Sequence, residues 1–314
     1  MMKRKSQVEK FLTDERGFAV VFVSLMMTVL LGTVALVADV GLLFLNKNRL
    51  ANACDAAALA GSQELPNKTK AKQVAEQYLQ HNDVELTEAE VSIYETGNSQ
   101  IIQVNSDRTV EFTFAKVLGV NAGTVNATSQ AAFGGVSSTT HVVPFSIPDQ
   151  ELKFGEEYTL KSGAGNGNSG NYGALALGGN GANQYRENII NGYNGRISVG
   201  DKVPTEPGNM SGPTMDGVEA RMKGCSHSCT PEKFDRNCSR LLVIPVYDPA
   251  SMGNGKTTVK IVGFALFLLT GVDGHGNQSN VHGYFLQSLP PDKSNATVSV
   301  GQEDYGLHAV KLIK

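Results

Sequence analysis

The feature that most constrains this chain is an uncharged apolar run near its N-terminus. Residues 18–38 read FAVVFVSLMMTVLLGTVALVA. At about 1.5 Å of rise per residue, a helix of this length spans about 30 Å, the thickness of a bilayer's hydrocarbon core. A cleavable signal peptide has a shorter apolar region that ends in a small-x-small site, whereas here Leu36 precedes Ala38. We therefore expect a retained membrane-spanning helix.

The charges that flank this run predict its orientation. Residues 1–17 hold Lys3, Arg4, Lys5, Lys10 and Arg16, and only Lys47 and Arg49 follow closely. Segments rich in Lys and Arg stay on the cytoplasmic side of a membrane. The sequence thus predicts a cytoplasmic tail at 1–16 and a single-pass protein of the cell membrane, with the lipid bilayer as one partner and the bulk of the chain extracytoplasmic.

The helix is expected to continue beyond the membrane. Leu50, Ala53, Ala57 and Ala60 keep a helical stripe, and Gly61 followed by Pro66 predicts where the helix ends. A helix over residues 17–60 would be roughly 66 Å long. Its outer half would project from the membrane and present an Ala-rich face to another surface.

Small and polar residues interrupt the apolar run. Ser24, Thr28 and Gly32 share one helical face, where small side chains let another helix approach or are simply tolerated. Asp39 is more unusual in this position, because a carboxylate at bilayer depth costs on the order of 3 kcal/mol or more. We expect Asp39 either to be satisfied at the outer headgroups or to bind a partner within the membrane.

A longer pattern runs through this region: an R-G start, the apolar span, D-V-G, and then R-L-x-x-A-x-D-A-A-A-L-A-G. It is matched by Arg16, Gly17, Asp39, Val40, Gly41, Arg49, Leu50, Ala53, Asp55 and residues 56–61. The pattern resembles the N-terminal module of the Tad (tight adherence, or Flp) pilus-assembly proteins of the TadG-like type. The resemblance implies a component of a pilus or secretion machine, with other Tad/Flp pilus-assembly membrane proteins as partners.

One position departs from the pilins of such systems. Those proteins carry a Glu five residues after a Gly, which the prepilin peptidase and filament packing use, whereas Gly17 is followed at that distance by Phe22. The resemblance therefore implies an uncleaved accessory component. Its expected helix-packing and anchor positions are Gly17, Ser24, Thr28, Gly32, Asp39, Gly41, Arg49 and Asp55.

The remaining sequence predicts an α+β fold in two parts behind the helix of residues 17–62. The first, at 63–134, has an amphipathic helix at 67–82, strands at 91–95, 101–105, 109–114 and 124–133, and a helical turn at 115–119. This part resembles the α+β heads of pilin-like proteins, and FAKVLG at 114–119 resembles a segment common in TadG-like heads. Residues 134–140, GGVSSTT, indicate a linker.

The second part, at 141–314, is expected to be a β-rich extracytoplasmic domain. Strand-like segments occur at 240–248, 257–272, 282–289 and 305–313, and the first two are predicted to form a hairpin. Residues 184–193 indicate a short helix. Residues 199–214 hold several Pro and Gly turn signals and are expected to form a surface loop.

Composition excludes several classes of function. A net charge of −3 argues against a nucleic-acid-binding surface. No G-x-S-x-G nucleophile motif accompanies the candidate acid–base residues, which are His275, His282, His308, Asp273 and Asp304. We therefore expect neither an enzyme nor a cofactor.

Three of the four cysteines form one cluster with a histidine. Cys225, His227, Cys229 and Cys238 offer thiolate and imidazole ligands, but C-x3-C-x8-C is not a standard zinc spacing. Outside the cell, a disulfide from Cys225 or Cys229 to Cys238 is the favoured fate, with free thiols and a metal left open. Cys54 lies on the Ala-rich helix face, where we expect it to be buried.

These observations leave three functional hypotheses. The first is an accessory component of a Tad/Flp-type pilus assembly or secretion system. The second is a surface adhesin that uses a Tad-type membrane anchor, with its second half touching a ligand. The third is an extracytoplasmic metalloenzyme that uses the Cys/His cluster.

Overall fold

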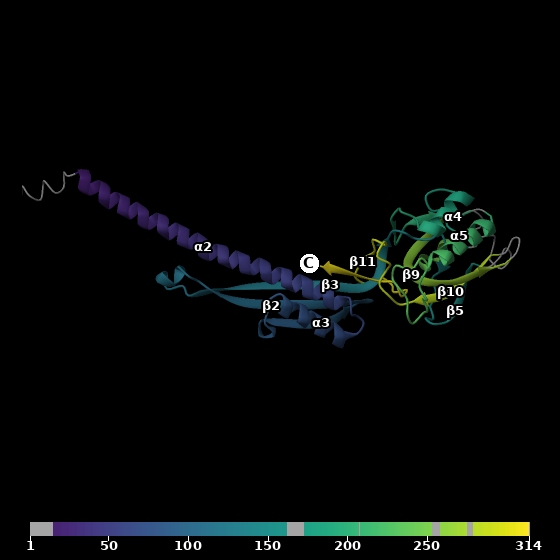
Figure 1. Ribbon diagram of the computed structural model, residues 1–314, viewed down its shortest axis with the longest axis horizontal. Helices are drawn as coiled ribbons and strands as arrows, with labels where there is room; N and C mark the ends of the chain where they lie inside the picture. The colour runs from purple at the N-terminus through teal and green to yellow at the C-terminus, as the bar shows by residue number, and fades with distance from the viewer. Residues whose placement is uncertain (1–14, 162–172, 207, 253–257, 275–278, 314) are drawn as a thin grey trace, which may run out of the picture.

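The computed structural model describes residues 15–161, 173–206, 208–252, 258–274 and 279–313. One long helix leads to a β-sheet that lies along its second half, and a rounded body follows at the far end (Figure 1). The expected fold class, α+β with a long N-terminal helix and a β-rich C-terminal part, is confirmed, and the body behind the helix contains two sheets.

The helix α2 (Glu15–Ser62) is continuous through the predicted apolar run and the Ala-rich stretch. It contains neither Pro nor any other break, and the hydroxyls of Ser24 and Thr28 bond back to carbonyls four residues earlier. Gly61 is inside the helix rather than a cap. A Cβ at Gly61 would lie 2.8 Å from the Ala71 carbonyl oxygen, so this glycine lets the next helix approach.

The first sheet is built around a long hairpin of β2 (Ser99–Glu111) and β3 (Ala122–Thr139), with β1 (Ala89–Thr96) beside β2. The two strands expected at 101–105 and 109–114 are one strand, because Asp107 and Arg108 stay in register with β3. The hairpin tip is residues 112–121, and it includes the predicted helical turn as η2 (Ala115–Leu118).

The predicted linker at 134–140 is wrong, since β3 continues through Thr139. Glycine is needed at positions 134 and 135 because other parts of the chain approach the β3 backbone closely there. A Cβ on Gly134 would lie 2.6 Å from Ser99 Oγ, and one on Gly135 would lie 2.1 Å from the Glu303 carbonyl oxygen. Glycine in a strand interior often marks such an approach of another backbone.

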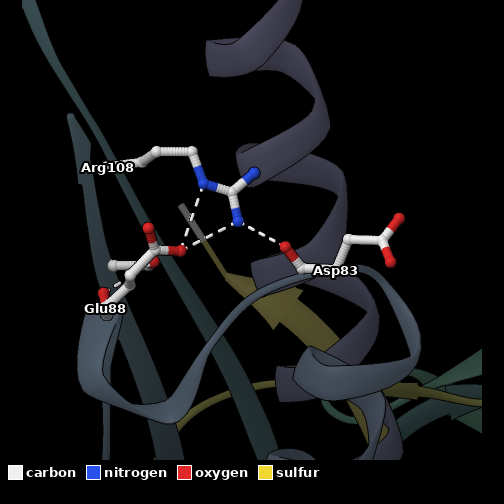
Figure 2. Close-up of polar contacts among 4 residues, drawn as sticks. Asp83, Glu88 and Arg108 are labelled. Carbon is white, nitrogen blue, oxygen red and sulfur yellow. Dashed lines mark hydrogen bonds and ion pairs between the residues drawn. The ribbon is translucent and has the colours of Figure 1, made fainter. Parts of the chain in front are cut away.

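Helix α3 (Lys68–His81) confirms the amphipathic pattern, with Ala71, Ala75 and Leu79 buried. The turn after it, which includes η1 (Leu86–Glu88), is fixed to β2 by Arg108 (Figure 2). The Arg108 guanidinium donates to Glu88 Oε2 at 2.9 and 3.1 Å and also to the Asp83 carbonyl. This contact holds α3 against the sheet.

The second sheet forms the rounded body. It has the order β4 (Ile147–Pro148), β8 (Leu241–Tyr247), β9 (Thr258–Asp273), β10 (Asn280–Leu286) and β5 (Glu157–Lys161), with β7 (Lys202–Pro204) on β9. The predicted β8–β9 hairpin is confirmed. Helix α4 (Ala182–Asn191) confirms the helix expected at 184–193. Every residue of β8 is buried, because side chains cover both faces of this sheet.

A second helix, α5 (Ser211–Gly224), begins inside the expected surface loop of 199–214, so that prediction is wrong at its C-terminal end. Pro213 lies in the first helical turn, where its missing N–H costs nothing. Gly217 packs on Ile189 of α4, and buried Arg221 donates to the Ile189 and Ser239 carbonyls.

The end of the chain returns to the first sheet. Strand β12 (His308–Ile313) pairs with β3 from Gln130 to Gly135, and β11 (Thr297–Val298) and the short β6 (Ile197–Ser198) also pair with β3. One buried cluster joins Ile101 and Ala132 of the first sheet to Leu266 of the second. These contacts join the two parts of the chain. The division into domains at 63–134 and 141–314 stays a prediction.

Candidate membrane-facing site

The first half of α2 is an exposed apolar rod. Its large side chains between Val20 and Val37 are exposed, and none of its most apolar stretch is buried. Among the described residues, α2 is the one helix long and apolar enough to cross a membrane. We call residues 19–38 the apolar segment. Exposed apolar surface of this size is unfavourable in water and marks a lipid or protein contact.

One face of the second half of the same helix is buried. Leu50, Ala53, Cys54, Ala57 and Ala58 are fully covered by α3 and the β2–β3 hairpin. The expected burial of Cys54 is confirmed. The Ala-rich face thus packs inside the chain, because small side chains let the helix lie close to the sheet, as at Gly123, where a Cβ would lie 3.2 Å from Leu43. We call residues 50–62 the buried segment.

Asp39 marks the junction between the two segments. Its side chain is only 3% exposed, and its carboxylate accepts hydrogen bonds from three successive backbone amides of the hairpin tip. Thr113 N lies 2.9 Å from Oδ1, and Phe114 N and Ala115 N lie 3.0 and 2.6 Å from Oδ2. These amides open η2, so the carboxylate satisfies donors that a short helix leaves unpaired.

The hairpin tip carries apolar side chains into solvent. Val117 and Leu118 are 87% and 81% exposed, and Phe114 and Val120 are about half exposed. In Figure 1 the hairpin runs back along α2 toward its N-terminal half. Its charged residue, Lys116, pairs with Glu111 at 2.9 Å, which turns the ammonium back toward the body of the head.

An apolar groove of about 640 Å³ separates the hairpin tip from the helix. Thr28, Gly32 and Leu36 line it on one side, and Phe114 and Leu118 on the other. Thr28 is eleven residues before Asp39, which is about 16 Å along a helix. The tip therefore lies beside the C-terminal part of the apolar segment and not merely at its end.

The predicted helix-packing positions fall into different surroundings. Thr28 and Gly32 line the groove, while Ser24 is exposed. A Cβ on Gly41 would meet nothing within 4 Å, and Arg49 is exposed. Asp55 is half-buried beside Cys54, and Gly17 lies within α2. Sequence reasoning missed the contact between Asp39 and the tip, although FAKVLG was the signal that singled out the tip.

The cysteine–histidine cluster lies in the rounded body formed by the second sheet, between the end of α5 and the start of β8. Side-chain ligand atoms of Cys225, His227, Cys229 and Cys238 all lie within 4.8 Å of one another. None of the three thiols is in a disulfide in this structure. The structure thus brings together the four residues that the sequence grouped, and the disulfide expected from Cys225 or Cys229 to Cys238 stays a prediction.

The candidate acid–base residues form local pairs. His282 lies between Asp273, at 3.0 Å, and the Thr159 hydroxyl, at 3.2 Å, in an exposed row across β9, β10 and β5. His308 Nε2 lies 2.9 Å from Asp304 Oδ2, and its ring contacts that of Phe133 in a tilted arrangement. His275 lies outside the described residues. Such rows are ordinary cross-strand and strand-end pairs.

The chain thus belongs to the class of proteins in which one exposed apolar helix carries an α+β head, here the part that follows α2. Residues 17–64 match the family described as putative Flp pilus-assembly TadE/G-like. The resemblance seen in the sequence from Arg16 to Gly61 is thereby confirmed. No curated protein and no solved structure matches the chain.

Proposed function

We propose that this chain is a membrane-anchored accessory component of a Tad/Flp-type pilus assembly or secretion system. The observation that carries the proposal is the division of α2 into an exposed apolar segment and a buried segment inside the head, with Asp39 at the junction. The Tad domain at 17–64 supports a role in pilus assembly. This family acts in structure and assembly rather than in catalysis.

The anchoring role follows from the charge and burial along α2. The apolar segment would cross the bilayer once, with residues 1–16 in the cytoplasm because of their excess of Lys and Arg. The exposed apolar side chains of the hairpin tip would then enter the outer leaflet beside it. Lys116 would point its charge back to the headgroups, as Lys does at membrane interfaces.

The groove between the tip and α2 gives the assembly role a physical basis. It is apolar, it includes Thr28 and Gly32, where small side chains leave space, and it would open at membrane depth if the apolar segment crosses the bilayer. A transmembrane helix of another Tad/Flp component is the protein partner that we propose for this surface, since small residues favour helix contacts in lipid. Lipid chains would occupy the groove in the absence of that partner.

Complementation of a strain that lacks the chain tests this function. Wild type should restore surface pilin recovered by shearing, and Gly32→Leu should reduce it severalfold by filling the groove, while Gly41→Leu, on open helix surface, should restore it. Normal pili with Gly32→Leu would contradict a role for the groove. Pili that assemble without the chain but fail to attach would favour an adhesin instead.

A further inference from the structure

We propose that Cys225, His227, Cys229 and Cys238 bind one Zn²⁺ ion in a tetrahedral structural site. The ligand atoms of all four residues lie within 4.8 Å of one another. With Zn–S bonds of about 2.3 Å, tetrahedral geometry separates two sulfurs by about 3.8 Å. Cys225 Sγ lies 2.7 Å from Cys238 Sγ, so these two sulfurs must move apart by about 1 Å to surround one ion.

The number of convergent ligands favours zinc over a disulfide. A disulfide uses two sulfurs and leaves one thiol and the imidazole without a role. Here the three sulfurs and the imidazole lie close together. All four residues belong to the loop that runs from the end of α5 to the start of β8. Three Cys and one His are a common closed set of ligands for structural zinc.

The surroundings of the cluster fit a zinc site. His227 Nε2 lies 3.7 Å from Asp235 Oδ2, so this carboxylate is near enough to become the outer partner that zinc-binding histidines usually have if Nδ1 binds the metal. Arg240 lies beside the three sulfurs. Three thiolates and Zn²⁺ carry a net charge of −1, which the Arg240 guanidinium balances.

The site would fix the loop of residues 225–240 against the core. Cys229 and Cys238 are buried in the cluster that joins the two sheets, and Arg240 donates to the Cys229 carbonyl at 2.6 Å. Zinc would thus hold α5 and β8 together where turns alone define the chain. Binding energy at such a site is folding energy.

Metal analysis of the full-length chain tests the proposal. The protein is purified in detergent from membranes of zinc-replete cells, without chelator or added reductant. We expect about one zinc per chain and four titratable thiols after denaturation with a chelator. Absence of zinc with two thiols would show a disulfide, and absence of zinc with four thiols would show free cysteines. Either result overturns the proposal.

Matched variants separate ligands from other cysteines. Cys229→Ser should lose zinc, whereas Cys54→Ala, at the buried cysteine of α2, should retain it. Asp235→Asn should fold normally and lower the zinc affinity about 10–100-fold, because only the outer carboxylate is lost. Asp107→Asn, on an exposed part of β2, is its control. Cobalt added to the apoprotein should give thiolate-to-cobalt charge-transfer absorption in the wild type, and its absence would contradict thiolate ligation.

Discussion

The two halves of α2 share one backbone and face opposite surroundings. The apolar segment is richer in Val, Leu and Met, yet it is exposed, while the Ala-rich segment is buried completely at Leu50 and Ala57. The difference shows that hydrophobicity alone does not decide which part of a chain enters its own core. Side-chain size and the nearby sheet decide it, because small residues let the helix lie flat on β2 and β3. The more apolar half is left for an external partner.

Removing the sheet's last strand should break this contrast most strongly. Deletion of residues 308–314 takes away β12, which pairs with β3 and contributes Leu312 beside the buried segment. We expect the first sheet to lose more than about 4 kcal/mol of stability. Limited proteolysis should then cut within residues 89–139. Lys311→Ala, at an exposed β12 side chain, should leave the digestion pattern unchanged. If the first sheet stayed protease-resistant after the deletion, it would be stable without β12, which contradicts this prediction.

A pair of matched substitutions sharpens the comparison directly. Leu50→Ala should reduce the free energy of unfolding of the head by about 2–5 kcal/mol, because it opens a cavity in a packed core. Leu30→Ala, at an exposed position of the same helix, should change it by less than about 0.5 kcal/mol. Chemical denaturation in detergent, followed by hydrogen exchange in α3 and β2, measures both. Equal effects would mean that both halves are packed alike.

Asp39 tests the junction between the halves. Asp39→Ala removes the acceptor of three amides, so Thr113, Phe114 and Ala115 should exchange their amide hydrogens about tenfold faster or more. Asp107→Asn, at an exposed residue of β2, should leave those rates unaltered. Unchanged exchange in Asp39→Ala would mean that the carboxylate does not hold the tip.

The smallest expected effect concerns pH at the start of β12. Partial burial would raise the pKa of Asp304, but the hydrogen bonds with His308 and the Gly306 amide hold it below its ordinary value. Its ionised form therefore adds stability well above the ordinary Asp pKa of about 3.9, and that stability is lost as the pH falls through the lower folded value. Asp304→Asn should flatten the acid limb of unfolding curves. An identical acid limb would remove this contribution.

Much of this architecture could be predicted from local patterns. The apolar run, the Ala stripe and the Tad-type motif predicted α2, and alternation of apolar residues predicted β8 and β9. The missed features depend on contacts between distant residues. GGVSSTT resembles a linker because only the folded chain shows that Ser99 and Glu303 approach those glycines. Pro213 suggested a turn, although it lies in the first turn of α5.

The candidate membrane-facing site shows the same limit. Asp39 and FAKVLG could each be singled out in the sequence, but their contact joins residues more than seventy positions apart. Only the register of β2 with β3 brings the tip back to the helix. The cysteine cluster was easier, because its four members lie within one short loop.

The most direct test of the central claim uses tryptophan, which the chain lacks. Three variants each carry one tryptophan, in place of Leu30 in the apolar segment, Leu118 in the hairpin tip or Phe154 in the rounded body. Each full-length variant is placed in bilayers that contain brominated lipid. We predict blue-shifted, strongly quenched emission for Leu30→Trp and Leu118→Trp and unquenched emission for Phe154→Trp. Emission from Leu30→Trp that brominated lipid leaves unquenched would contradict the claim that this half of α2 lies in the membrane.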